Sequence, residues 1–168
     1  MQDRPKIKPV LSATDKLVEK MGWVLIAILW LMVIISFSSL PDTIPTHFDG
    51  AGKVDDYGSK YTIFLLPIIA TVIFSGMSAL NNFPYLFNYP VVITEENAAE
   101  QYSNAVRMIR YLKVSVVLVF LVITIQTLLS VNGKNDLIGI WMLPLILGIV
   151  FVPLVYFILK SIKNNKIK

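Results

Sequence analysis

The sequence predicts an all-α, polytopic membrane protein with four transmembrane helices and one further amphipathic helix at the cytoplasmic interface. Three observations predict this fold class. Hydrophobic residues make up 55% of the chain and charged residues only 15%, whereas charged residues reach about 25% in typical soluble domains. Four long windows contain no charged residue, and a bilayer requires apolar runs of this length. The basic residues flank the windows, as they do in membrane proteins.

Each window has the length that a membrane-spanning helix needs, which is about 20 residues for ~30 Å of hydrocarbon. The windows are Gly22–Leu40, Tyr61–Leu80, Val114–Val131 and Leu137–Leu159. They are apolar on every face, and backbone amides find no water partner in lipid, so we expect helices. A cleaved signal peptide is the alternative for the first window. Because a 21-residue polar segment precedes this window, we expect an uncleaved helix.

The placement of Lys and Arg predicts the orientation of these helices. Twelve basic residues fall on one side of the predicted membrane and three on the other. The twelve are Arg4, Lys6, Lys8, Lys16, Lys20, Arg107, Arg110, Lys113, Lys160, Lys163, Lys166 and Lys168; the three are Lys53, Lys60 and Lys134. The positive-inside rule then places both termini in the cytoplasm. This distribution argues against nucleic acid as a partner and for the lipid bilayer.

The windows divide the chain into five segments. These are a cytoplasmic N-terminal segment (1–21), a first helical hairpin (22–80) with its outer loop (41–60), a cytoplasmic loop (81–113), a second helical hairpin (114–159) and a basic cytoplasmic tail (160–168). Within the cytoplasmic loop, apolar residues recur at helical spacing at Ala98, Tyr102, Ala105, Ile109 and Leu112. We interpret this stripe as an amphipathic helix at the inner interface. It packs on lipid or on the bundle, or it binds a protein partner.

The outer loop contains most of the candidate site residues. Prolines and glycines predict an irregular loop with turns. The loop holds the only histidine of the chain and four aspartates. The ligand-binding candidates are His47, Asp49, Asp55, Asp56 and Lys60, and the weak metal candidates are His47, Asp49 and Asp55.

Three kinds of chemistry compete for these residues. An EF-hand calcium loop that starts at Asp49 fails, because the later ligand positions hold Ala51, Lys53 and Lys60. A zinc site would have one histidine, carboxylates and no cysteine, which is a small ligand set. Acid–base catalysis by a histidine–aspartate pair is the third possibility. Structural roles in turns and helix capping compete with all three. We expect no cofactor, and a divalent metal stays open.

The outer loop resembles the signature of the domain of unknown function 1648, a family of bacterial membrane proteins that includes the SdpI-like immunity proteins. The residues that carry the resemblance are Leu40, Pro41, Ile44, Pro45, Thr46, His47, Phe48, Gly52, Asp55, Gly58, Ser59 and Lys60. The similar region covers about Val24 to Ile73. The resemblance implies a bacterial cytoplasmic membrane, and it supplies no catalytic residue.

These observations favour a non-enzymatic membrane protein that senses or binds a ligand or peptide at its outer loop. The SdpI-like relatives protect the cell from a secreted killing peptide, which makes an immunity-like or signalling-like role one form of this hypothesis. A peptide or protein partner would bind at the outer loop or at the cytoplasmic helix. The alternatives are an envelope hydrolase or metal-binding protein that uses His47 and the loop aspartates, and a structural subunit of a membrane complex. A transporter is disfavoured, because the four windows contain no charged residue.

Overall fold

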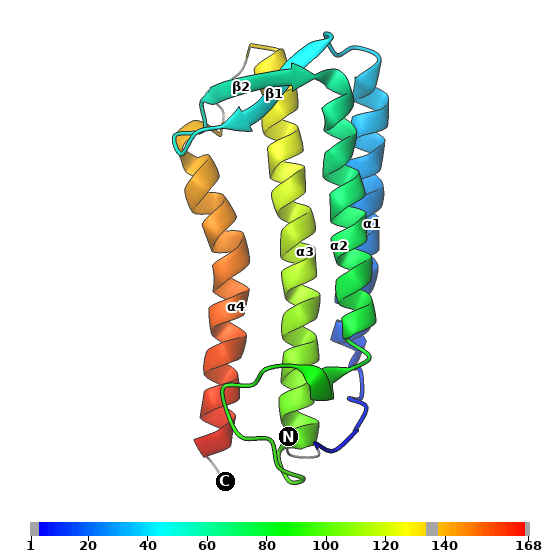
Figure 1. Ribbon diagram of the computed structural model, residues 1–168, viewed down its shortest axis with the longest axis vertical. Helices are drawn as coiled ribbons and strands as arrows, with labels where there is room; N and C mark the ends of the chain where they lie inside the picture. The colour runs from blue at the N-terminus through cyan, green and yellow to red at the C-terminus, as the bar shows by residue number, and fades with distance from the viewer. Residues whose placement is uncertain (1–3, 134–137, 167–168) are drawn as a thin grey trace.

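The computed structural model describes residues 4–133 and 138–166 and has the form of an elongated helical bundle (Figure 1). The long helices are α1 (Ala13–Phe37), α2 (Leu65–Leu80), α3 (Ala98–Val131) and α4 (Met142–Lys166). The strands β1 (Thr43–Phe48) and β2 (Val54–Ser59) and the 3-10 helices η1 (Lys60–Phe64), η2 (Pro84–Leu86) and η3 (Gly139–Trp141) lie between them. Both chain termini lie at one end of the bundle, which we call the terminal end. The two strands lie at the opposite end, the hairpin end.

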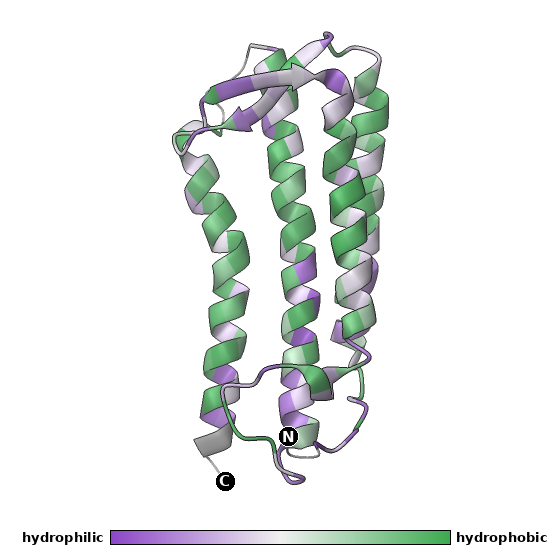
Figure 2. Ribbon diagram, in the orientation of Figure 1, coloured by the Kyte–Doolittle hydropathy of each residue, from purple (hydrophilic) through white to green (hydrophobic). Residues whose placement is uncertain are grey.

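Among the described residues, four helical segments are long and apolar enough to cross a membrane, and each overlaps one predicted window. They are Ala13–Phe37, Lys60–Leu80, Ala98–Val131 and Gly139–Asn164. The second and third windows lie wholly inside their segments, whereas the first window extends past the end of α1 at Phe37. The predicted start of the fourth window, Leu137, lies outside the described residues. Figure 2 shows hydrophobic residues along the helix bodies and hydrophilic residues toward both ends. This pattern suggests a membrane protein.

Helix α1 begins well before the predicted window, because its N-terminus has a complete cap. The Ser12 side chain accepts a hydrogen bond from the Asp15 backbone amide, and the Asp15 carboxylate accepts one from the Ser12 amide. This reciprocal pair is a capping box, which satisfies two amides that a helix otherwise leaves unbonded. The predicted N-terminal segment 1–21 is therefore helical from Ala13 onward.

The prediction of a separate interfacial helix is wrong. Residues 98–113 form the first turns of α3, a single helix of 34 residues. Neither proline nor glycine occurs in it, so nothing interrupts the helix where the amphipathic stretch meets the apolar window. The apolar stripe packs on protein: Ala98 and Tyr102 are fully buried in a cluster with Ile93, against Tyr85 and Tyr89.

The prediction of an irregular outer loop is also wrong, since the loop forms an antiparallel hairpin of β1 and β2. Thr43 pairs with Ser59 and Phe48 with Val54, with irregularities in register around His47. Asp49 closes the connecting turn, because its carboxylate accepts hydrogen bonds from the amides of Ala51 and Lys53. The protein is therefore mainly helical and not strictly all-α.

Helices α1, α2 and α3 pack together, whereas α4 packs chiefly on α3 (Figure 1). The core of the three-helix unit includes Leu29, Ala70, Phe74 and Val117, all fully buried. Gly22 allows α1 to approach α2 closely, because a Cβ atom there would lie 2.3 Å from the ring of Phe74. Helix α4 is the least buried span in the structure, with 11% of its apolar window buried.

Polar contacts join α4 to α3 along the length of their seam. The Ser115 hydroxyl donates a hydrogen bond to the Ile149 carbonyl at 2.7 Å. Pro153 has no amide hydrogen, so it leaves the carbonyl of Ile149, four residues earlier, without its helical partner. Nearer the terminal end, Asn104 donates to the Phe157 carbonyl at 2.9 Å. Helix α3 thus supplies the hydrogen bond that the proline removes from α4.

Candidate functional site

The sole histidine of the chain lies in the hairpin and contacts an aspartate of the partner strand. His47 Nδ1 is 2.5 Å from Asp55 Oδ1, so two of the predicted site residues lie together. Both side chains are largely exposed, 68% and 45% respectively. Water competes for and screens an ion pair at such a surface position. The contact joins the two strands of the hairpin. It is also the histidine–aspartate pair that acid–base catalysis would use.

The other predicted site residues have local structural partners. The Asp49 carboxylate holds the hairpin turn, and the Asp56 carboxylate accepts from the amide of Tyr57. Lys60 forms an ion pair with Asp42 at 3.0 Å and lies over the ring of Phe37. Lys60 and Asp42 thus close the base of the hairpin. Among the residues that the structure describes, no group of three or more histidines, aspartates or glutamates is placed to hold a metal ion.

The base of the hairpin is anchored in the bundle. Ile44 is 1% exposed and packs in a cluster with Val33, Leu40 and Ile63 at the hairpin end of the three-helix unit. Strand β1 also packs on α3. The hairpin lies in the connection between α1 and α2, and it extends across the end of α3 toward α4 (Figure 1). Its orientation is therefore fixed by buried apolar contacts and not only by its own hydrogen bonds.

The tip of the hairpin meets the segment that leads into α4. Gly52 has a φ angle of +73°, and a Cβ atom there would lie 2.2 Å from the carbonyl oxygen of Gly139. Only glycine allows this close approach of two backbones. The side-chain amide of Gln126 on α3 lies 3.5 Å from the Gly52 carbonyl. The hairpin therefore connects the α1–α2 unit directly to the start of α4.

A cavity of about 690 Å³ lies beside this contact. Its lining comes from the hairpin (Ala51, Gly52, Lys53, Val54 and Tyr57) and from the segment before α4 (Gly139 and Ile140). Tyr57 and Ile140 are 60% and 70% exposed. An occupant of this cavity would touch the hairpin and α4 at the same time. The cavity has the size of a small-molecule or short-peptide site.

Comparison with known proteins finds a family similarity in the first half of the chain. Residues 24–71 match the family model described as "Domain of unknown function (DUF1648)". This stretch of the chain is similar to that family. The chain is also 32% identical over 88 residues to an uncharacterized protein of Archaeoglobus fulgidus. The aligned region covers 48% of this chain and 48% of the relative, so the chain matches about half the length of that relative. No solved structure matches the chain.

The matched region includes the second half of α1, the whole hairpin, η1 and the start of α2. It contributes one side of the hairpin-end cavity, and Gly139 and Ile140 contribute the other from outside the matched region. Of the cavity residues, the sequence signature identified only Gly52. Lys53 and Tyr57 show no distinguishing signal, because an isolated lysine or tyrosine in a loop is typical of any exposed turn.

A buried cluster of charges at the terminal end was not predicted from the sequence. Lys113 of α3 is fully buried and bonds to Glu19 of α1 at 2.6 Å and to Ser78 of α2 at 2.5 Å. Arg110 lies 3.4 Å from the same carboxylate. The charges occur just outside the apolar windows, where sequence reasoning places solvated residues. The partners are distant in sequence, so the local pattern gives no signal of the pairing.

Proposed function

We propose that this protein is a membrane-embedded binding protein whose ligand site is the cavity between the hairpin tip and the start of α4. The observation that carries the proposal is the backbone contact between Gly52 and Gly139. Two segments from opposite halves of the chain line one cavity there. A ligand in that cavity changes the contact between those halves directly.

A peptide is the ligand class that we favour. The two-stranded sheet leaves one edge of each strand without a strand partner among the described residues. An extended peptide can add to such an edge through backbone hydrogen bonds, while a neighbouring pocket takes alternate side chains. Tyr57 provides an exposed aromatic surface beside the cavity, and aromatic residues are enriched at binding interfaces.

The position of α4 provides a route from this site to the other end of the bundle. Helix α4 is held by α3 along one seam and by the hairpin at one end. It is otherwise the least buried span of the structure. Displacement of the hairpin tip would therefore tilt α4 about the Ser115–Ile149 hydrogen bond. Signalling by this route requires two positions of α4 and a ligand that binds the protein more tightly when α4 is in one of them.

We propose further that the terminal end lies in the cytoplasm and the hairpin outside the cytoplasmic membrane. The excess of basic residues at the terminal end supports this orientation. A bacterial membrane, which the family resemblance implies, stays a prediction.

Hydrolysis is a second candidate, because His47 and Asp55 are in contact. We favour binding, since the cavity lining does not include either residue. A His47→Ala variant separates the two candidates. It leaves a binding function intact when the protein folds normally, whereas it abolishes catalysis that uses this histidine as a base.

The binding proposal is tested by complementation of a strain that lacks the gene. Gly52→Ala removes the contact with Gly139, and Tyr57→Ala removes the exposed ring. Gly133→Ala is the matched control for the first variant, because Gly133 has a similar φ of +72° and nothing lies within 4 Å of its Cβ position. We expect Gly133→Ala to rescue the deletion phenotype and the other two to fail at equal expression. Full rescue by Gly52→Ala and Tyr57→Ala would refute the proposal.

A further inference from the structure

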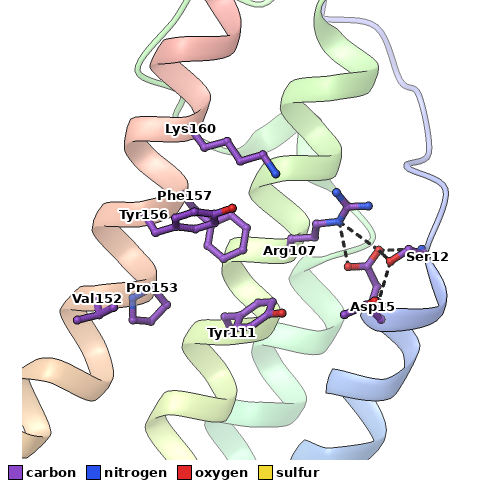
Figure 3. Close-up of a pocket in the computed structure, with 10 residues that line it drawn as sticks. Ser12, Asp15, Arg107, Tyr111, Val152, Pro153, Tyr156, Phe157 and Lys160 are labelled. Atoms are coloured by element: carbon purple, nitrogen blue, oxygen red, sulfur yellow. Dashed lines mark hydrogen bonds and ion pairs between the residues drawn. The ribbon is translucent and has the colours of Figure 1, made fainter.

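A second cavity, of about 780 Å³, lies at the terminal end between α1, α3 and α4. Figure 3 shows its lining: Asp15 comes from α1, Arg107 from α3, and Val152, Pro153, Tyr156 and Lys160 from α4. The cavity is at the opposite end of the bundle from the proposed peptide site. A ligand in this cavity would therefore bind independently of a peptide at the hairpin.

The cavity has a charged level and an apolar level. Arg107 and Lys160 approach it from two different helices, and Asp15 is the carboxylate among the lining residues. Val152 and Pro153 lie nearer the hairpin end of α4 than Lys160 does, inside the apolar part of the helix. A helix rises about 1.5 Å per residue, so Lys160 lies ~12 Å along α4 from Val152. The cavity thus crosses the boundary at which the apolar helix surface ends.

The two cations differ in how far they are neutralised. The Arg107 Nε atom donates to both Asp15 oxygens, at 3.0 and 3.3 Å, and this carboxylate also accepts from Ser12. The Lys160 ammonium lies 5.9 Å from the centre of the Tyr156 ring, and no described carboxylate forms an ion pair with it. The Lys160 charge is therefore available to an incoming anion. Arg107 is fixed by Asp15 and still presents its terminal nitrogens.

We propose that this cavity binds an anionic phospholipid, with the phosphate between Arg107 and Lys160 and one acyl chain along Val152 and Pro153. A guanidinium held in place and an ammonium suit a phosphate diester. The apolar surface that continues from the cavity favours a lipid over a free anion, because Val152 and Tyr156 are 69% and 57% exposed. On a membrane-spanning helix, such exposed apolar side chains contact acyl chains. A lipid bound there would fill the gap between α1 and α4.

The test compares lipid binding by variants of α4 in the full chain. Protein is reconstituted in nanodiscs of phosphatidylcholine with or without 20 mol% phosphatidylglycerol, and retained lipid is measured by native mass spectrometry together with thermal unfolding. Lys160→Gln removes the cation that no described carboxylate neutralises. Lys163→Gln is the matched control, because Lys163 lies on the same helix end, is exposed and does not line the cavity. Lys160→Arg keeps the charge and is the rescue variant.

We expect phosphatidylglycerol to stabilise the wild type, Lys163→Gln and Lys160→Arg, and to bind Lys160→Gln roughly tenfold more weakly. That factor corresponds to the loss of one charge-assisted hydrogen bond. Equal phosphatidylglycerol binding by Lys160→Gln and Lys163→Gln would overturn the site. Equal stabilisation by the two nanodisc compositions would overturn the preference for an anionic lipid. A shift produced by inorganic phosphate in detergent, and absent with phosphatidylglycerol, would assign the cavity to a free anion and overturn the lipid.

Discussion

The ammonium of Lys113 lies 2.6 Å from the carboxylate of Glu19, across 94 positions of sequence, and is fully buried. It also bonds to the Ser78 hydroxyl and lies 4.2 Å from the centre of the Phe74 ring. These partners come from α1 and α2, so one α3 side chain ties the three helices together at the terminal end. A buried cation needs such partners, because its desolvation costs several kcal/mol.

Removal of the Glu19 charge is expected to destabilise the bundle strongly. Glu19→Gln leaves the buried Lys113 without its counter-charge, which costs about 3–5 kcal/mol. The double variant Glu19→Gln/Lys113→Met removes both charges and is expected to recover part of the loss. Thermal unfolding of detergent-purified protein measures this double-mutant cycle. A loss in the double variant equal to the sum of the losses in Glu19→Gln and Lys113→Met alone would show that the two side chains are not coupled.

Gly22 and Gly76 provide a matched pair of helix glycines. Alanine is favoured over glycine in a helix by about 1 kcal/mol, but a Cβ atom at Gly22 would meet the buried Phe74 ring. That ring is confined by Trp23 and Lys113, and overpacking costs about 1–3 kcal/mol. We expect Gly22→Ala to lower the melting temperature. Gly76→Ala, with open space at its Cβ position, should not lower it, and the reverse order would contradict the packing.

Ser115 is expected to stabilise α4 through the carbonyl that Pro153 leaves unpaired. Ser115→Ala should cost about 1–3 kcal/mol, because the Ile149 carbonyl loses its partner in an apolar setting. Ser103→Ala is the control, since that exposed hydroxyl bonds only to the carbonyl of Ala99 on its own helix. Thermal unfolding of the two variants tests the assignment. An equal, small effect of both would show that Ser115 does not fill this role.

The orientation of the chain can be tested by single-cysteine labelling, because the sequence contains no cysteine. Lys53→Cys places a thiol on the hairpin, and Lys163→Cys places one at the terminal end. We expect a membrane-impermeant maleimide to label the first in intact cells and the second only after permeabilisation. The opposite labelling pattern would reverse the proposed orientation.

Hydropathy predicted the four long helices because a bilayer requires apolar length, and this property is local in the sequence. The hairpin was missed because its residues also suit an irregular loop. Pro45 and Gly58 are residue types that are unfavourable inside strands, and only one strand buries apolar side chains. What holds the strands in place is Ile44 packed on the bundle, which is a tertiary contact. The stripe of α3 was read correctly as helical, but its partner surface could not be identified from the sequence.

The sequence offers candidate residues from one segment only, the outer loop. The structure brings two of them, His47 and Asp55, together. The hairpin-end cavity depends on Gly139 and Ile140, which follow the third helix and are distant in sequence from the hairpin. The cavity at the terminal end is likewise lined by residues of three helices. Cavities formed between distant segments leave no pattern in any one of them.

If the hairpin positions α4, the distance between α1 and α4 at the terminal end depends on the contact between Gly52 and Gly139. Spin labels at Lys16→Cys and Lys163→Cys report the separation at the terminal end by pulsed electron spin resonance in nanodiscs. We predict that Gly52→Ala broadens or shifts this distance distribution, whereas Gly133→Ala leaves it as in the parent. A Gly52→Ala distribution that matches the parent would show that the hairpin contact does not hold α4 in place.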